Sequence, residues 1–397
     1  MSSKQDYFIE INYAQRFKNK MRVSGDTFIS KKIKESRRII NVLSDGLGSG
    51  IKANVLSTLT ASMALKYAAA DRDLSKAAKT IMRTLPVDAV RKISYSTFTI
   101  LDIDYLGKCS IIEYDNPPYV LIRNGEVVDI PKQVISGKIE DHRDYELHLS
   151  ELKMEIGDKL IFFSDGVTQS GIGSNRYPFG WGQENIIDFL KYQYNRDRTV
   201  SARKLAARVV EHAFANCNYK ATDDITCGVI NIRKPRKLLV LTGPSVKEEN
   251  DSFMAKYLEN YRGKTAICGG TTTQIISREL KRKFTVDIDS LDPEVPCCST
   301  MPGVDLVAEG MLTLGKAMEI LEKGCPEEEM QRNHGAVKLI NLFLESDLIE
   351  FMVGTKINEV HQDPNMPIEL GIRRNTMKSL ARILDEKYLK ETRVQFI

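Results

Sequence analysis

The sequence has little of what marks several large classes of protein. No apolar run approaches the roughly 18 residues that a membrane-spanning helix needs, and the segment from Met1 to Asp6 lacks the apolar core of a signal peptide. The net charge of +4 is too small by itself to indicate nucleic-acid or membrane binding. We therefore expect a cytoplasmic protein that binds neither nucleic acid nor membrane.

Soft metal ligands are also scarce. The seven cysteines form no C-x-x-C pair, and the five histidines show no metal-ligand spacing, which argues against a zinc site. The cysteine count is odd and the expected compartment is reducing, so the sequence predicts free thiols. The vicinal pair Cys297-Cys298 is read as small residues of a loop, with a thiol-reactive site as the alternative.

Acidic side chains, by contrast, recur in one context. Four short stretches place an Asp at the end of an apolar run, where we expect a strand to stop and a loop to begin. These motifs are Val23-Ser24-Gly25-Asp26, Val42-Leu43-Ser44-Asp45-Gly46, Phe162-Phe163-Ser164-Asp165-Gly166 and Ala221-Thr222-Asp223-Asp224-Ile225-Thr226. Carboxylates that converge in one fold repel each other unless cations lie between them. Oxygen ligands suit Mg²⁺ or Mn²⁺. Each Asp alone is an ordinary turn residue, but no structural need explains four in this order.

The chain length of 397 residues predicts two domains. The sequence predicts a strand-rich unit over residues 1–233, a boundary at the basic stretch Lys234-Pro235-Arg236-Lys237, and a smaller, parallel α/β domain over residues 238–397. A long helix is expected from Ile51 to Ala70, because this stretch is rich in Ala and Leu and lacks Pro and Gly. Its small residues at helical spacing indicate either close packing in the core or a helix that slides against its neighbour. They are Ala53, Ser57, Ala61, Ala64 and Ala68.

In the second domain, the turn Gly269-Gly270-Thr271-Thr272 follows a short predicted strand and opens a helix. Such a turn favours a phosphate or carboxylate ligand, although Gly-rich turns that merely join packed elements are the alternative. A charged helix is expected from Gly371 to Thr392. Its apolar stripe suits docking on its own domain or, alternatively, a homodimer contact.

The order and spacing of the four acidic motifs resemble the metal-dependent serine/threonine protein phosphatases of the PPM or type 2C family, in particular the SpoIIE-like and RsbU-like bacterial branch. The resemblance covers about residues 1–232. It implies an α+β fold in which helices flank a β-sandwich of two antiparallel sheets, with metals in a cleft at one end.

The resemblance also implies roles for individual residues. Asp45 would bridge two Mn²⁺ or Mg²⁺ ions, Gly46 would offer its carbonyl to one of them, and Asp26 would either bind a metal directly or support the residues that do. Asp165 and Asp223 would hold the metals from the other side, with Asp224 as the alternative ligand. The catalytic set is therefore Asp45, Asp165 and Asp223.

Other residues are weaker candidates. Arg22 is a candidate for binding the substrate phosphate, but a solvated strand Arg is the favoured interpretation. His142 and His148 are candidate general acids, against the simpler reading as surface histidines.

The sequence thus predicts a metal-dependent phosphatase that hydrolyses phosphoserine or phosphothreonine in a phosphoprotein through a metal-activated water. Its C-terminal domain would bind a small-molecule or anion ligand and regulate the activity. The alternative from another class is a binding or scaffold protein that keeps the phosphatase fold but has little activity. A phosphatase for small molecules is a third reading.

Overall fold

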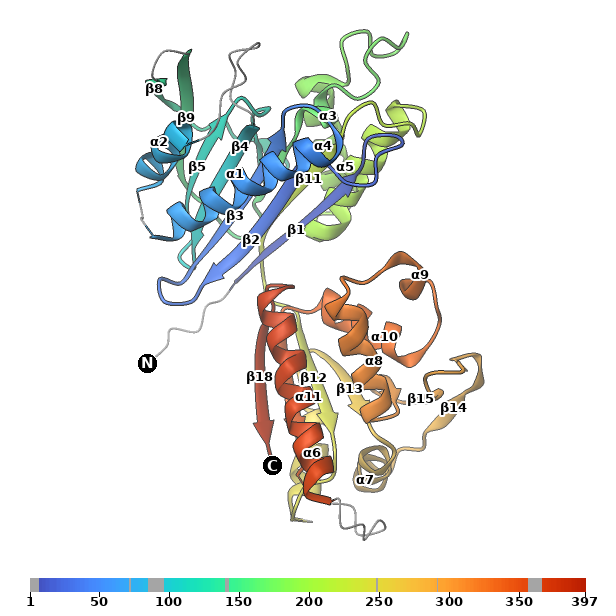
Figure 1. The fold of residues 1–397 in the computed structure, drawn as a ribbon. Helices are drawn as coiled ribbons and strands as arrows, with labels where there is room; N and C mark the ends of the chain where they lie inside the picture. Colours follow the sequence, from blue (N-terminus) through green and yellow to red (C-terminus); the bar gives the residue numbers. More distant parts are fainter. Residues whose placement is uncertain are drawn as a thin grey trace. The chain divides into compact units, whose positions relative to one another are not determined.

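The computed structural model describes residues 7–70, 73–84, 96–139, 143–247, 249–290, 292–355 and 366–397. The chain divides into two compact units, Met1–Lys234 and Pro235–Ile397, here called the N-terminal and the C-terminal unit (Figure 1). Within the described residues, no helix combines the length and the apolar character needed to cross a membrane.

Two antiparallel sheets form the N-terminal unit. One has the order β1-β11-β10-β6-β7 and the other the order β2-β3-β4-β5-β9-β8. The strands of the first sheet are β1 (Phe8–Arg16), β6 (Val120–Arg123), β7 (Glu126–Val127), β10 (Lys159–Phe163) and β11 (Ile225–Arg233). Those of the second are β2 (Asp26–Ile33), β3 (Arg38–Gly46), β4 (Ser96–Asp104), β5 (Lys108–Tyr114), β8 (Gln133–Ile139) and β9 (Arg143–Lys153). A tight two-residue turn at Asn124-Gly125 joins β6 to β7, and both residues have positive φ, 53° and 89°.

Helices cover the sheets, as the apolar patterns of the strands require. Residues of α1 (Gly50–Ala70) and α2 (Leu74–Thr84) share a core with β3 and β4. Residues of α3 (Asp165–Thr168), α4 (Gly182–Arg196) and α5 (Ala202–Asn216) share one with β10 and β11. The strands β3 and β10 are buried along almost their whole length, which explains their continuous apolar runs. The predicted fold, a β-sandwich flanked by helices, is confirmed.

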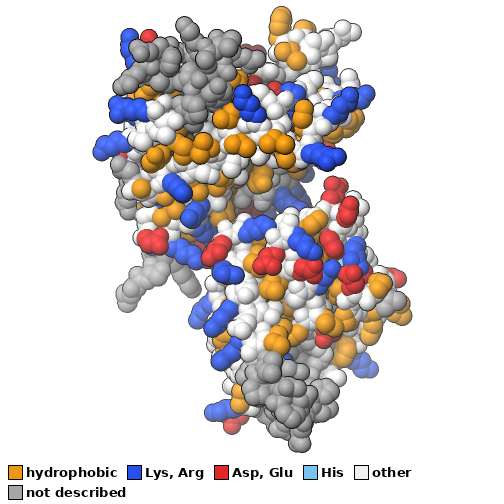
Figure 2. Space-filling view, viewed as in Figure 1, with side chains coloured by type: hydrophobic (Ala, Val, Ile, Leu, Met, Phe, Trp, Pro, Cys, Tyr) orange, Lys and Arg blue, Asp and Glu red, His pale blue; other side chains and the backbone are white. Residues whose placement is uncertain are grey.

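The long helix α1 has two different faces. Its buried residues are Ala53, Ser57, Thr60, Ala61, Ala64 and Ala68, which include all five of the small residues noted in the sequence. Such short side chains let the helix axis approach the sheet closely. Its other face exposes Ile51, Val55 and Leu59, which are 75%, 58% and 46% exposed (Figure 2).

The C-terminal unit is built on one sheet with the order β14-β15-β16-β13-β12-β17-β18. The strands from β16 to β18 in this order are parallel, whereas β14, β15 and β16 pair antiparallel. The strands are β12 (Lys237–Thr242), β13 (Lys264–Cys268), β14 (Thr285–Asp287), β15 (Cys298–Met301), β16 (Val304–Ala308), β17 (Leu348–Val353) and β18 (Glu391–Phe396). The helices are α6 (Glu249–Glu259), α7 (Gly270–Leu280), α8 (Met311–Glu322), α9 (Glu327–Met330), α10 (Gly335–Glu345) and α11 (Met366–Glu386).

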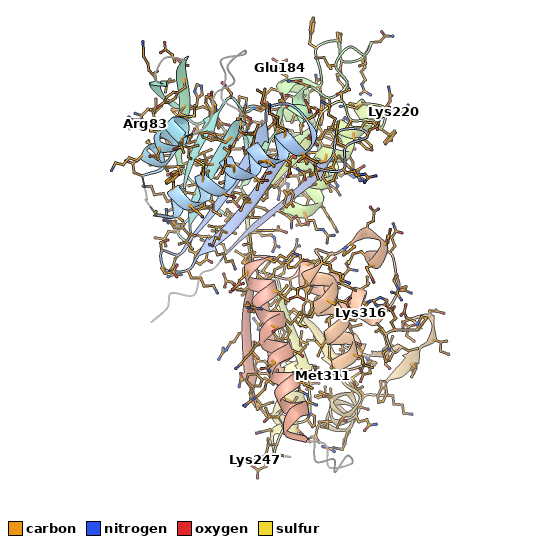
Figure 3. All side chains as sticks on the ribbon, viewed as in Figure 1. Arg83, Glu184, Lys220, Lys247, Met311 and Lys316 are labelled. Carbon is orange, nitrogen blue, oxygen red and sulfur yellow. The ribbon has the colours of Figure 1, made fainter. Side chains whose placement is uncertain are left out.

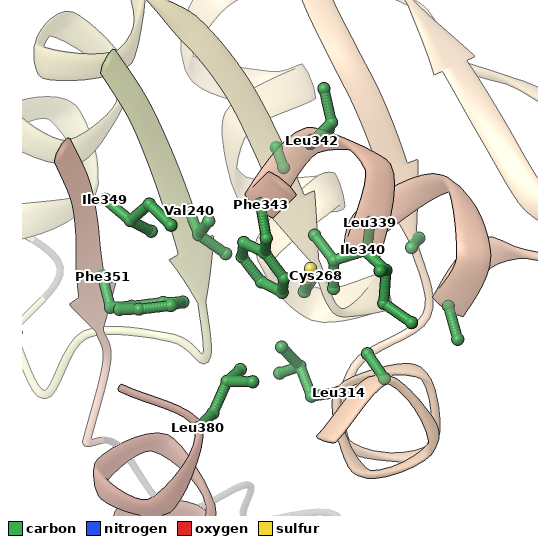
Figure 4. Packing of buried hydrophobic residues seen from close by; sticks show 14 of the residues in the cluster. Val240, Cys268, Leu314, Leu339, Ile340, Leu342, Phe343, Ile349, Phe351 and Leu380 are labelled. Carbon is green, nitrogen blue, oxygen red and sulfur yellow. The ribbon is translucent and has the colours of Figure 1, made fainter. Parts of the chain in front are cut away.

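One face of this sheet packs on α8, α10 and α11. Figure 4 shows the result: Phe343 of α10 and Leu380 of α11 meet Val240 and Phe351 of the central strands, and the Cys268 thiol points into the same core. A second core, formed with α6 and α7, includes Leu239, Leu241 and Ile276. Burial on both sides explains why β12 reads as an unbroken apolar run.

Two expectations for this unit were wrong in part. The helix expected from Gly371 to Thr392 begins at Met366 and ends at Glu386, because the chain turns at Leu389, which has a φ of 56°. Residues 391–396 then form β18, which pairs in parallel with β17. The domain was also expected to be wholly parallel, but the β14–β15 hairpin extends one edge of the sheet in antiparallel pairing.

Candidate metal centre

The pairing of β2 with β3 brings the first two acidic motifs together. In the antiparallel register, Asp26 lies directly opposite Asp45. Asp26 opens β2 rather than ending a strand, whereas Asp45 is the penultimate residue of β3. Because Gly46 backs onto α1, a Cβ there would lie 2.1 Å from the Ala53 carbonyl oxygen, so this position requires glycine.

The other two motifs belong to the first sheet. Asp165 follows β10 as the first residue of α3, and Asp223 and Asp224 immediately precede β11. Hydroxyl groups join the two sheets here: Ser164 Oγ and Thr226 Oγ1 donate to Asp26 Oδ2 at 2.7 and 2.6 Å. The four motifs therefore meet at one end of the sandwich, where strands of both sheets begin or end.

A pocket of about 440 Å³ opens at this end. Its lining includes Asp45, Gly46, Asp165 and Asp223, from three of the four motifs. Asp26 does not line it and is only 3% exposed, so this side chain lies behind the pocket wall. The remaining lining residues are Lys18, Leu47, Gly48, Ser49, Ser96, Thr97, Tyr114 and Asp115.

The carboxyl groups strongly affect one another. Burial raises the pKa of Asp26 to about 8. The charges of Asp224 and Asp165 add to this rise, whereas the hydrogen bonds from Ser164 and Thr226 oppose it. Burial, followed by the charges of Asp26, Asp165 and Asp223, raises the pKa of Asp45 well above its ordinary value. The pKa of Asp165 is also raised, by burial and by the charge of Asp223. The cluster thus favours bound protons or bound cations.

Asp223 and Asp224 face different surroundings. Asp224 is 4% exposed, and its carboxylate accepts hydrogen bonds from two backbone N–H groups, that of Lys18 at 3.0 Å and that of Gly25 at 2.8 Å. Asp223 lines the pocket, and its Oδ1 lies 3.6 Å from Lys18 Nζ. Asp224 therefore ties the β1–β2 connection to the start of β11, whereas the Asp223 carboxylate is open to the pocket.

The donor set fits a hard divalent cation. The acidic side chains here offer only oxygen, which suits Mg²⁺ or Mn²⁺. Two carboxylate oxygens, Asp26 Oδ1 and Asp165 Oδ1, are buried and have no hydrogen-bond partner among the described residues, which is costly unless a cation or proton compensates. Over the described residues, no three His, Cys, Asp or Glu side chains form a ready-made ligand set for a metal ion.

The structure leaves other predicted residues outside the pocket. Arg22 is exposed and does not contribute to the lining. His148 lies on β9, opposite Glu113 of β5, and is also absent from the lining. His142 falls outside the described residues.

Sequence reasoning missed two charged residues of the pocket, Lys18 and Asp115. Lys18 lies in the connection between β1 and β2, eight residues before Asp26, in a stretch without a turn motif. Asp115 directly precedes Asn116-Pro117-Pro118, whose residue types indicate a turn and no ligand, and its φ of 52° sets it in the left-handed region. The positions of these residues depend on the tertiary fold, so no local pattern could have found them.

Comparisons with known proteins agree with this architecture. The family model described as stage II sporulation protein E (SpoIIE) matches residues 35–233. Stage II sporulation protein E of Bacillus subtilis (strain 168) is 25% identical over 231 residues, which is 58% of this chain and 26% of the relative. The chain thus spans about a quarter of the length of this curated relative.

Two solved structures are similar. The phosphatase domain of SpoIIE from Bacillus subtilis is 20% identical, with a TM-score of 0.43, over 58% of this chain and 94% of that chain. The RsbU and RsbW domains of Rv1364c from Mycobacterium tuberculosis are 15% identical, with a TM-score of 0.44, over 64% of this chain and 67% of that chain.

The N-terminal unit is therefore a PP2C-type phosphatase domain. Since the family model matches half of its residues, the chain belongs to the SpoIIE family.

Proposed function

We propose that this protein is a metal-dependent protein serine/threonine phosphatase regulated by its C-terminal unit. The observation that carries the proposal is the convergence of the Asp45, Asp165 and Asp223 carboxylates on one pocket, with the buried Asp26 behind them. Repelling carboxylates are costly to bring together, and a bound cation offsets that cost.

The acidic residues at the pocket would have different roles. Asp45, Asp165 and Asp223, together with the carbonyl of Gly46, would hold two Mn²⁺ or Mg²⁺ ions. Such ions supply a water of lowered pKa and neutralise charge on the phosphate. Asp26 lies behind the pocket wall and supports Asp45. The Ser164 and Thr226 hydroxyls fix its carboxylate, and Asp26 is opposite Asp45 in the β2–β3 pair. Asp224 keeps the β1–β2 connection in place and does not hold a metal.

Among the residues that the structure describes, Lys18 rather than Arg22 would bind the substrate phosphate. Its side chain is 31% exposed and lines the pocket, and its ammonium lies 3.6 Å from the Asp223 carboxylate. Its own backbone N–H is anchored to Asp224, which holds the residue at the rim. When cations occupy the carboxylates, the ammonium is free to turn to an entering phosphate dianion.

The proposed substrate is a phosphoprotein bearing phosphoserine or phosphothreonine. The test is phosphate release by the full-length protein from a phosphothreonine peptide, compared with release from glycerol phosphate at the same concentration. We expect release from the peptide in Mn²⁺ and none in EDTA. Faster release from glycerol phosphate than from the peptide would contradict the protein substrate, and equal release in EDTA would contradict the metal mechanism.

A further inference from the structure

The C-terminal unit brings two similar turns together. Strands β13 and β16 are parallel neighbours with Cys268 opposite Ala308, and each strand is followed by a glycine that caps a helix: Gly269 for α7 and Gly310 for α8. The Gly269 N–H donates to the Ala308 carbonyl at 2.9 Å, which fixes the turns side by side. Neither helix has a side-chain cap at its N-terminus, so first-turn N–H groups of both helices remain available to an anion.

Buried side chains at these turns independently indicate a ligand. Thr272 and Thr313 occupy the same position, three residues after the capping glycine of their helix. Both are fully buried, and within the described part of the chain the hydroxyl of each lacks a hydrogen-bond partner. The Thr272 hydroxyl lies only 3.4 Å from the place where a Cβ on Gly269 would be, so it points into the turn. Burying a polar group without a partner is costly, and a ligand in the turn would supply the partner.

Glu309 adds an acceptor to the same place. It precedes the capping Gly310, and its Oε2 is buried with no hydrogen-bond partner in the residues that the structure describes. Its charge also contributes to the raised pKa of the Cys268 thiol, at the end of the neighbouring strand. The turns therefore combine backbone donors and hydroxyls with one carboxylate.

The glycines of the first turn leave open space. Gly269 needs to be glycine because its φ is 131°. The backbone at Gly270 does not require glycine, because its φ lies outside the left-handed region. No atom of the described residues lies within 4 Å of the place where its Cβ would be. Glycine at the start of a helix is otherwise unfavourable, so a backbone left bare at Gly270 suits close approach by a ligand.

The topology places these turns where ligands bind in open α/β sheets. Such sheets bind ligands at the carboxyl ends of their parallel strands, and the turns follow the carboxyl ends of β13 and β16. Met311 begins α8, whereas Lys316 lies further along it (Figure 3) and is paired with Glu294 at 2.9 Å. The positive ends of the helices, rather than this ammonium, therefore face the turns.

We propose that these paired turns bind a ribonucleoside triphosphate, with phosphate on the N-termini of α7 and α8 and a ribose hydroxyl donating to Glu309. Inorganic phosphate fits poorly, because it brings charge toward the Glu309 carboxylate without a sugar hydroxyl to satisfy it. A ribonucleotide carries both the anion and the donor. This nucleotide site is distinct from the phosphatase pocket, and binding there does not depend on the activity of that pocket.

The test is calorimetric titration of the full-length protein with ATP and with GTP. EDTA is present throughout, so that a nucleotide cannot bind through metals at the acidic pocket. We expect at least one of the two nucleotides to bind. Inorganic phosphate and the 2′,3′-dideoxy form of that nucleotide should bind at least tenfold more weakly. The absence of binding by both nucleotides, or binding of glutamate or phosphate in their place, would overturn the proposal.

Matched variants locate the site. Thr272→Val removes the unpartnered hydroxyl and should weaken nucleotide binding about tenfold without lowering the melting temperature. Thr265→Val is the control, because it removes another buried, unpartnered hydroxyl at the opposite end of β13. Gly270→Ala should also weaken binding, whereas Gly315→Ala, where a Cβ likewise meets no atom within 4 Å, should not. Unchanged affinity in both Thr272→Val and Gly270→Ala would overturn the assignment.

Discussion

At the residue scale, the adjacent aspartates Asp223 and Asp224 have different roles. Asp223→Asn should reduce Mn²⁺ affinity and leave stability almost unchanged, because its side chain is 41% exposed. Asp224→Asn should lower the free energy of unfolding by about 1–3 kcal/mol, because an amide cannot accept both buried backbone N–H bonds. Chemical denaturation and Mn²⁺ titration of both variants check this, and the reverse pattern would make Asp224 the metal ligand.

The buried Asp26 predicts a pH dependence for the metal-free protein. Its pKa rises from 3.8 to about 8 on folding, mainly through burial. Between these values the folded protein holds a proton that the unfolded chain has released, so stability falls as the pH rises through this window. Below pH 4 both states are protonated and the dependence ends.

Denaturation in EDTA at several pH values measures this slope. Asp26→Asn should flatten it by at most about 1.4 kcal/mol per pH unit, and the exposed control Asp144→Asn should not change it. Mn²⁺ should also reduce the slope, because it favours the ionised carboxylates. A stability that rises with pH in EDTA would contradict a protonated Asp26.

The acidic residues were predictable because each motif combines a local strand signal with an Asp. Asp45, Asp165 and Asp223 do meet in one pocket. Lys18 was not predictable, because its approach to Asp223 depends on the Asp224 carboxylate, 206 residues later, which holds its backbone. Long-range hydrogen bonds of this kind leave no periodic trace in a sequence.

At the scale of elements, β3 and α1 approach each other very closely at the site. A Cβ on Gly46 would lie 2.1 Å from the Ala53 carbonyl oxygen, so helix and strand meet backbone to backbone. Gly46→Ala should therefore lower the free energy of unfolding by about 1–3 kcal/mol or more. Gly315→Ala, with open space around it, is the matched control. Equal stability of Gly46→Ala and wild type in thermal denaturation would show that α1 is free to move away.

Elements were predicted well where one pattern dominated. The long helix α1 and the buried strands β3, β10 and β12 follow directly from composition and apolar runs. The final strand β18 was missed because its neighbour Leu389 ends the helical stretch through a positive φ, which its residue type does not signal. Pairing with β17 then favours the strand over a continued helix.

For the whole molecule, each unit has its own hydrophobic core. Residues 1–234 should therefore fold alone and release phosphate in Mn²⁺. If the C-terminal unit regulates the phosphatase, kcat/KM of this fragment should differ at least about fivefold from that of the full-length protein. Equal values, with and without ATP or GTP, would contradict regulation by the C-terminal unit.

The central claim is that the acidic pocket is a metal-dependent phosphatase centre. The most direct test compares wild type, Asp45→Asn and the exposed control Asp144→Asn in Mn²⁺, measuring phosphate release from a phosphothreonine peptide together with the number of bound ions. We predict two ions and steady release for wild type and control, and lost release with at least one ion fewer for Asp45→Asn. A folded Asp45→Asn protein that binds two ions and releases phosphate at the wild-type rate would contradict the account.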